Sequence, residues 1–382
     1  MILRIISNLL SMSFVIALLT VSSFVHAERD EIRLFIPAFK GPGNLGVNVA
    51  TILNLQIWRT LRMEPDKNPQ GEDFGLGMIV WGESPLLEDS HIAAEKVATL
   101  DNINSQFSFW GETFRYGNGV IGQTYLSIPV FSDHQRDGIA LDDYRNKYNE
   151  IWTHSIKVKN KKIQLKVDIP NRRYEFSPIY LSKSIVDKFS LPSKLIMYKD
   201  PDRSSPIVGE VGNKYIGIEP RGHYQKVYSD GKRGWVYLPQ LAKERNEVVD
   251  FIGGLIRIYR ADWHGAKDLM KRVIETPSTA TTLKVDALLY KGRCLEETGA
   301  SGEKAFELAF KLNSYNHNTV RYWMMSQLTV LFQLNKAKIY DQEFDNKLTK
   351  AKMLLKNSRF LFREDDPWLN DVDFILKNLT KN

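Results

Sequence analysis

The chain has 382 residues, of which 43% are hydrophobic and 25% are charged, and its formal net charge is +7. This length allows two or three globular domains, and the composition excludes collagen-like, disordered and multi-span membrane proteins. Because the only cysteine is Cys294, no intramolecular disulfide can form, and stability has to come from ordinary apolar cores.

Residues 1–27 have the features of a secretory signal. Arg4 precedes a long apolar run, and Val25 and Ala27 place small residues just before the charged Glu28. We therefore expect cleavage after Ala27, a periplasmic or secreted location, and no stable membrane span after signal removal; an uncleaved anchor is the alternative. An exported chain is not expected to bind nucleic acid, and its mild positive charge is compatible with an anionic envelope polymer or a lipid surface.

Residues 28–190 are predicted to form an α/β domain in which strands and helices alternate. Apolar side chains recur there with the period typical of strands or with helical spacing. The predicted elements are a strand at 32–39, a helix at 44–62, a strand at 74–81, a helix at 86–100 and two strands at 106–116 and 120–130. In the first helix, Asn48, Thr51 and Arg59 lie opposite the apolar positions, so this helix is expected to pack on a sheet.

The last two of these strands are joined by Gly117-Asn118-Gly119, which predicts a tight hairpin. The order of strand, helix, strand, helix and hairpin over residues 30–131 is similar to the small α/β domain at the front of the periplasmic Tol-system translocation protein, and in curli-secretion and flagellar-assembly lipoproteins. The resemblance implies this fold and an envelope setting, and it carries no catalytic residue to this chain.

A second hairpin is predicted from two strands at residues 151–158 and 163–169, with Lys159-Asn160-Lys161-Lys162 between them. Further basic residues surround it and make a local basic patch: Lys157, Lys166, Arg172 and Arg173. We interpret these lysines as protection of edge strands, in preference to a phospholipid or glycan site. A short helical pattern at residues 185–189 leads into the next domain.

Residues 195–241 indicate a small all-β barrel, because short apolar or aromatic runs alternate there with Pro, Gly and Asp. Asp230-Gly231 can adopt positive φ and should close a hairpin between residues 224–228 and 234–238. Residues 194–241 resemble the bacterial SH3 family through three ordered motifs: Pro206-Ile207-Val208-Gly209, Tyr224-Gln225-Lys226-Val227 and Gly231-Lys232-Arg233-Gly234-Trp235-Val236.

The candidate ligand-binding residues are aromatic side chains of this barrel: Tyr198, Tyr215, Tyr224 and Trp235. Tyrosine and tryptophan rings line many peptide grooves. The resemblance implies that the ligand is a peptidoglycan stem or cross-bridge peptide. Trp235 stands in the signature position of the family and is expected to pack in the barrel more than to contact ligand, which leaves the three tyrosines as the exposed residues.

From residue 247 onward the strand signals end and helical patterns follow one another in pairs. The predicted helices cover 247–261, 266–275, 283–298, 302–312, 319–334, 341–361 and 368–379. Gly254 and Gly292 stand 38 residues apart, close to the tetratricopeptide period, and Gly254 and Ala266 have the spacing of small residues in that family. The resemblance implies a small α-solenoid whose groove holds a peptide or is filled by the barrel.

Catalytic and metal-binding signatures are weak throughout the sequence. The histidines that follow the predicted signal are scattered without metal-ligand spacing: His91, His134, His154, His223, His264 and His317. Cys294 lies inside a helical run with no nearby base, so we interpret it as a buried structural thiol. No nucleotide-binding loop or serine-nucleophile motif occurs, and we predict no cofactor and no metal.

These observations predict a multidomain protein: a signal peptide at 1–27, an α/β (α+β) domain at 28–190, an all-β SH3-like barrel at 191–243 and all-α TPR-like repeats at 244–382. We interpret it as a non-catalytic adaptor or scaffold of the cell envelope. The barrel would bind a peptide or peptidoglycan, and the repeats would bind an unknown periplasmic protein. The alternative is a cell-wall hydrolase or accessory enzyme with an unrecognised site in residues 28–190.

Overall fold

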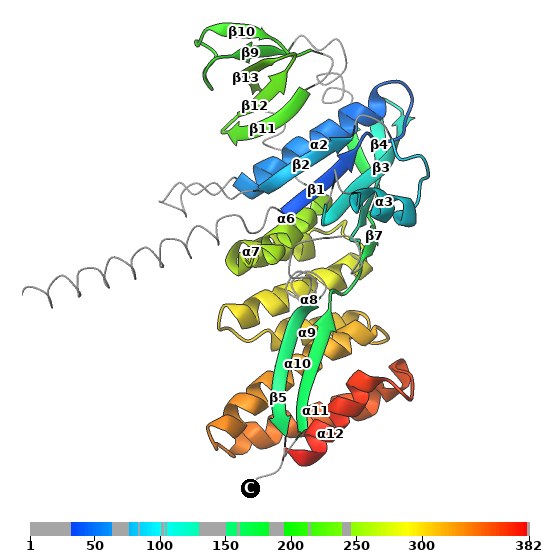
Figure 1. Ribbon diagram of the computed structural model, residues 1–382, viewed down its shortest axis with the longest axis vertical. Helices are drawn as coiled ribbons and strands as arrows, with labels where there is room; N and C mark the ends of the chain where they lie inside the picture. The colour runs from blue at the N-terminus through cyan, green and yellow to red at the C-terminus, as the bar shows by residue number, and fades with distance from the viewer. Residues whose placement is uncertain are drawn as a thin grey trace, which may run out of the picture.

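The computed structural model describes residues 32–62, 76–82, 85–100, 103, 105–129, 150–158, 161–182, 195–212, 215–238 and 246–379. The protein is a mixed α/β structure whose parts follow one another along its long axis (Figure 1). A five-stranded sheet lies at one end, a larger mixed sheet comes next, and the helices of the carboxy-terminal half extend to the other end. The predicted signal and the helical pattern at 185–189 lie outside the described residues.

The mixed sheet contains the first strands of the chain. Its members are β1 (Ile32–Pro37), β2 (Leu76–Gly82), β3 (Phe107–Tyr116), β4 (Gly119–Ser127), β7 (Arg173–Glu175) and β8 (Ile179–Ser182), in the order β2-β1-β3-β4-β7, with β8 also paired to β4. β1 is parallel to β2 and β3, and β3 is antiparallel to β4. The predicted β3–β4 hairpin is present. Tyr116 pairs with Gly119, so residues 117 and 118 form the loop, and Gly117 is the loop residue with positive φ.

Helix α2 (Leu45–Arg62) lies between this sheet and the five-stranded sheet (Figure 1). The sequence predicted one packed face, but the polar residues Asn48, Thr51 and Arg59 are buried as well. Strand β11 (Tyr215–Arg221) and helix α6 (Glu247–Tyr259) cover α2 in addition to the mixed sheet. Arg59 donates a hydrogen bond to the backbone oxygen of Gly222 in the turn after β11. The helix is therefore enclosed, because segments distant in sequence cover its polar side.

The five-stranded sheet is antiparallel throughout. Its strands are β9 (Ile196–Tyr198), β10 (Ile207–Glu210), β11, β12 (Tyr224–Ser229) and β13 (Lys232–Tyr237), in the order β10-β9-β13-β12-β11. Asp230 and Gly231 form the two-residue turn between β12 and β13, with φ values of 47° and 78°. The turn predicted from the sequence is confirmed at these residues.

The carboxy-terminal half is helical at the positions predicted. After α6 come α7 (Trp263–Glu275), α8 (Thr281–Glu297), α9 (Glu303–Leu312), α10 (His317–Lys336), α11 (Gln342–Ser358), a 3₁₀ turn (Arg359–Leu361) and α12 (Pro367–Asn378). α7 begins three residues earlier than predicted because Asp262 caps it, accepting a hydrogen bond from the Gly265 amide at 3.0 Å. A Cβ atom at Gly292 would lie 2.3 Å from the ring of Phe306, so α8 and α9 pack closely there because this position is glycine.

A hairpin from the amino-terminal half packs along these helices. Strands β5 (Glu150–Val158) and β6 (Lys161–Asp168) form a separate two-stranded sheet that runs along α8 to α12 (Figure 1). Its inward side chains share one core with those helices and are all buried: Trp152, Ile156, Val158, Ile163, Leu165 and Val167. The sequence interpretation left the groove of the predicted repeats to a peptide or to the barrel; the side of α8 to α12 that shares this core is covered by the chain's own hairpin.

Candidate binding surface on the five-stranded sheet

The two faces of the five-stranded sheet differ in burial. Met197, Val227 and Val236 point to the inner face and belong to the same apolar core as α2 and α6. Side chains alternate between faces along a strand, and directly paired residues share a face. The opposite face consequently carries the residues at alternate positions, and these are largely aromatic. We call this set the aromatic face: Tyr198, Tyr224, Tyr228, Trp235 and Tyr237.

Strand register brings the aromatic face together. Trp235 of β13 pairs with Tyr198 of β9, and Tyr237 pairs with Tyr224 of β12. The ring centroids of Tyr224 and Tyr237 are 5.1 Å apart, and His223 makes an edge contact with Tyr237 at 6.2 Å. Three strands, β9 and the β12–β13 hairpin, thus present these rings on one face of the sheet.

Two cations lie over rings of the aromatic face. The Lys226 ammonium is 5.4 Å from the centroid of the Trp235 ring, and the Arg203 guanidinium is 5.3 Å from that of Tyr237. Attraction between a cation and an aromatic face contributes about 0.5–1 kcal/mol at exposed sites. The surface therefore combines aromatic rings with cationic groups, a combination that suits a ligand with both apolar groups and carboxylates.

Burial separates the predicted site residues into two groups. Trp235 is only 6% exposed, as expected for a side chain that mainly packs, whereas Tyr198 and Tyr224 are half-buried and Tyr228 is 40% exposed. Tyr215 pairs with Ser229 at the start of β11 and with none of the other predicted residues; its side chain lies outside the part that the structure describes. The structure thus joins Tyr198, Tyr224 and Trp235 on one face.

Four residues of this surface were not among the predicted binding residues: Arg203, Lys226, Tyr228 and Tyr237. The position of Lys226 could have been inferred from the predicted turn, because a two-residue loop at Asp230-Gly231 places Lys226 opposite Trp235. Tyr237 could have been placed on the same face as Trp235, because it stands two positions later in the strand and side chains alternate between faces. Arg203 belongs to the segment between β9 and β10, and no local sequence pattern places its side chain over Tyr237.

The helical half is a second place where a ligand was expected, and the β5–β6 hairpin packs there on the helices. Trp152 of the hairpin lies 6.0 Å from Phe306 and 6.3 Å from Tyr322, measured between ring centroids. The Arg293 guanidinium is placed 4.6 Å from the Trp152 ring and 5.6 Å from the Trp263 ring. Burial lowers the pKa of Arg293 to about 10, and the group remains protonated at neutral pH.

Polar contacts hold both ends of this hairpin to the helices. The Tyr322 hydroxyl donates to the backbone oxygen of Asp168 at 3.0 Å, and His154 Nε2 lies 2.6 Å from Thr329 Oγ1. Lys161 donates to Asp371 at 2.9 Å near the turn of the hairpin. Because buried apolar contacts and these hydrogen bonds act together, the hairpin is part of the folded helical unit.

Within the described residues of the region 28–190, where the hydrolase alternative would place its site, a serine–histidine contact is present. His91, the first residue of α3 (His91–Ala98), has Nδ1 2.8 Å from Ser127 Oγ. Ser127 is fully buried, and its Oγ also accepts a hydrogen bond from Trp110 Nε1 at 3.0 Å. Burial and the nearby Arg173 lower the pKa of His91. A substrate carbonyl has no access to a serine in this position, so the contact organises the packing of Trp110.

Cys294 is buried on α8, as predicted, and burial raises the pKa of its thiol to about 12. A thiol with this pKa is protonated at neutral pH, and the protonated form is a poor nucleophile. Among the described residues, no group of three His, Cys, Asp or Glu side chains is arranged to hold a metal ion.

No protein-family model, curated protein or solved structure matches this chain. Within the described residues, none of the helices combines the length and the apolar character needed to cross a membrane.

Proposed function

We propose that the chain is an exported, non-catalytic adaptor of the cell envelope, with an SH3-like barrel at residues 191–243 and TPR-like repeats at residues 244–382. The observation that carries this proposal is the aromatic face, on which Tyr198, Tyr224 and Tyr237 accompany two cations on one side of a short antiparallel sheet. Rigid amphipathic rings of this kind bind peptides with little loss of conformational entropy.

The ligand proposed for the aromatic face is a peptide of the cell wall. Stem and cross-bridge peptides of peptidoglycan combine methyl groups, amides and free carboxylates. Tyrosine rings can pack on the first two, and the exposed Arg203 guanidinium supplies positive charge for the third. The resemblance of residues 194–241 to bacterial SH3 modules supports the same class of ligand.

A protein partner of the helical half would bind outside the groove, since the β5–β6 hairpin fills it. Exposed apolar side chains are present on α9, on the segment after it and on the 3₁₀ turn. Tyr315 and Phe360 are 77% and 69% exposed, and their ring centroids lie 6.2 Å apart. Leu312, at the end of α9, is exposed as well. Exposed aromatic side chains in contact with each other are typical of protein interaction sites.

Sedimentation with purified peptidoglycan tests the wall-binding part. We expect the full chain to sediment with peptidoglycan and the double variant Tyr224→Ala/Tyr237→Ala to bind roughly 30-fold more weakly, because truncation of a central interface ring costs about 1 kcal/mol or more. The matched control is Tyr116→Ala/Tyr180→Ala, which removes two exposed tyrosines of the mixed sheet. Equal binding by wild type and the Tyr224/Tyr237 variant would contradict the proposal.

Murein zymography tests the hydrolase alternative. An adaptor leaves the gel uncleared at any protein amount. Clearing by wild type that is lost in Ser127→Ala or in Cys294→Ser would show that the chain is an enzyme and would overturn the proposal.

A further inference from the structure

The β5–β6 hairpin has one face packed on the helices and one face in solvent. The inner face is apolar and buried, as described above. The outer face is polar along its whole central part and carries three lysines, two hydroxyl groups and one amide: Thr153, Ser155, Lys157, Lys162, Gln164 and Lys166. We call this set the lysine face. Since the inner face anchors the strands, the lysine face is a firmly supported surface.

Strand register places two of these lysines against each other. Lys157 pairs directly with Lys162, so their Cβ atoms are about 5 Å apart on the same face. Like charges in this position destabilise a hairpin unless an anion lies between or above them. Lys161 differs from these two lysines because its ammonium group forms an ion pair with Asp371 at 2.9 Å. Within the described part of the chain, neither Lys157 nor Lys162 has a carboxylate partner.

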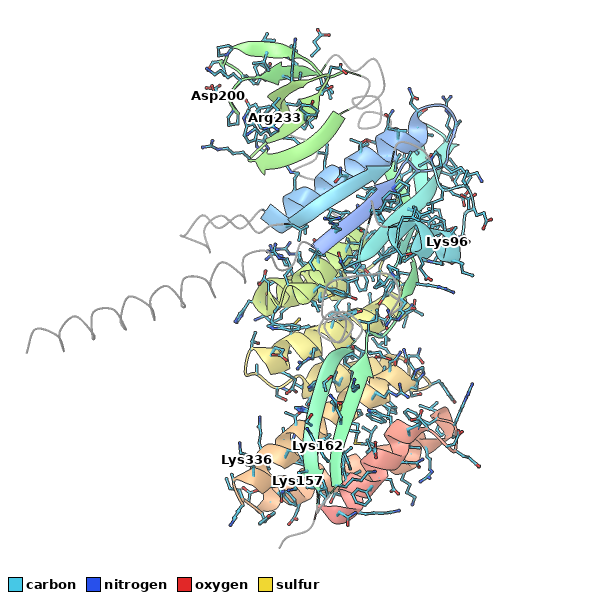
Figure 2. The ribbon with its side chains drawn as sticks, viewed as in Figure 1. Lys96, Lys157, Lys162, Asp200, Arg233 and Lys336 are labelled. Atoms are coloured by element: carbon cyan, nitrogen blue, oxygen red, sulfur yellow. The ribbon has the colours of Figure 1, made fainter. Side chains whose placement is uncertain are left out.

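A further lysine lies towards this end of the hairpin. His154 contacts Thr329 and Phe332, so β5 runs along the last turns of α10, and Lys336 follows one turn after Phe332. Figure 2 labels Lys157, Lys162 and Lys336 at the same end of the molecule. The nearby Asp371 is paired with Lys161, and Asp168, at the other end of β6, lies six positions from Lys162, or roughly 20 Å along the strand.

We propose that the lysine face binds the surface of an anionic lipid bilayer. Lysine ammonium groups interleaved with hydroxyl and amide donors match phosphate-bearing headgroups in charge and in hydrogen bonding. The face belongs to a two-stranded sheet and spans about 13 Å along each strand, so it suits an array of headgroups on a plane. This proposal is independent of the aromatic face and of its ligand.

Protection of edge strands is the competing explanation for these lysines. Charged side chains on an edge strand hinder pairing with another chain wherever they stand. That role gives no reason for two lysines to face each other across the hairpin, and it predicts no binding to lipid. The two explanations therefore differ in a measurable outcome.

Vesicle sedimentation of the full chain tests the proposal. Wild type is expected to bind vesicles that contain phosphatidylglycerol more tightly than vesicles of pure phosphatidylcholine, with affinity falling as salt is added. Lys157→Gln/Lys162→Gln should bind the anionic vesicles about 30-fold more weakly, since each lysine near such a surface contributes about fivefold. Residues 1–27 are common to all variants and contribute equally.

The matched control is Lys96→Gln/Lys304→Gln, which removes the same charge from two other exposed lysines. Lys96 lies far from the hairpin in Figure 2. This control should retain wild-type binding to anionic vesicles. Equal losses in the two double variants would reduce the effect to overall charge and overturn the proposal. Unchanged binding of Lys157→Gln/Lys162→Gln to anionic vesicles would also overturn the proposal. The same holds if this variant loses binding to peptidoglycan and keeps its binding to vesicles.

Thermal unfolding provides a second measurement on the same variants. Removal of the opposed charges should leave the unfolding midpoint of Lys157→Gln/Lys162→Gln equal to or above that of wild type. A clearly lower midpoint would mean that the lysines stabilise the hairpin and would contradict the reasoning from unrelieved repulsion.

Discussion

The buried carboxyl group of Asp286 makes the stability of this protein depend on pH in an unusual direction. Asp286 belongs to α8 and is 6% exposed, and burial raises its pKa from 3.8 to about 7, although a hydrogen bond from Tyr174 opposes the shift. The hydroxyl oxygen of Tyr174 lies 3.4 Å from the hydroxyl oxygen of Tyr290. The carboxyl group is therefore surrounded by phenols and protonated in the folded protein over most of the acidic range.

The sign of the effect follows from proton binding. Between about pH 4 and pH 7 the folded protein holds a proton on Asp286 that the unfolded chain has released, so the free energy of unfolding falls as the pH rises. A pKa difference of roughly three units corresponds to about 4 kcal/mol in total. This contribution is fully present below pH 4 and is lost above pH 7.

Asp286→Asn removes the titration while keeping an oxygen that accepts a hydrogen bond. We expect the variant to match wild type near pH 4 and to be more stable by up to about 4 kcal/mol at pH 8. Urea unfolding of both proteins at pH 4, 6 and 8 measures the difference, and other titrating groups cancel between the two curves. A variant that is less stable than wild type at pH 8 would show that the ionised carboxylate is stabilised in the fold, and would refute the reasoning.

Two further predictions concern the helical half. Trp152→Ala should destabilise the protein by about 3–5 kcal/mol, because it empties a core site that contacts Phe306 and Tyr322. Hydrogen exchange should accelerate in α8 to α12 more than in α2, and equal acceleration everywhere would contradict the assignment of Trp152 to a separate core. Cys294 should react with a thiol reagent only after denaturation, because it is buried and its pKa is about 12; rapid reaction of the native protein, followed by absorbance, would show that α8 is open at this position.

The sequence predicted those features that depend on local chemistry. The Asp230-Gly231 turn and the order of helices in the carboxy-terminal half were predicted correctly because neighbouring residues determine them. The helix predicted at 86–100 is confined to His91–Ala98, since Ser90 caps it by accepting a hydrogen bond from the Ala93 amide at 3.1 Å.

Long-range packing was predicted less well. The polar side of α2 has the composition of a solvent-facing surface, and nothing near it in sequence reveals that β11 and α6 cover it. The β5–β6 hairpin was predicted with a four-residue connection, but Lys161 and Lys162 belong to β6, and this shorter loop is what places Lys162 opposite Lys157. The aromatic face likewise depends on the pairing of β9 with β13, which are separated by more than 30 residues of sequence.

Helix α8 joins the two apolar cores of the described structure. Leu283, Ala287 and Tyr290 pack into the core shared by the mixed sheet, α2 and the five-stranded sheet. Leu288 and Leu289 of the same helix pack into the core shared by the hairpin and the later helices. Because the polar side of α2 is also buried against β11, continuous buried contacts connect the aromatic face at one end of the protein with the lysine face towards the other. These buried contacts hold the two faces at a defined separation, because each face is supported by a core in which α8 takes part.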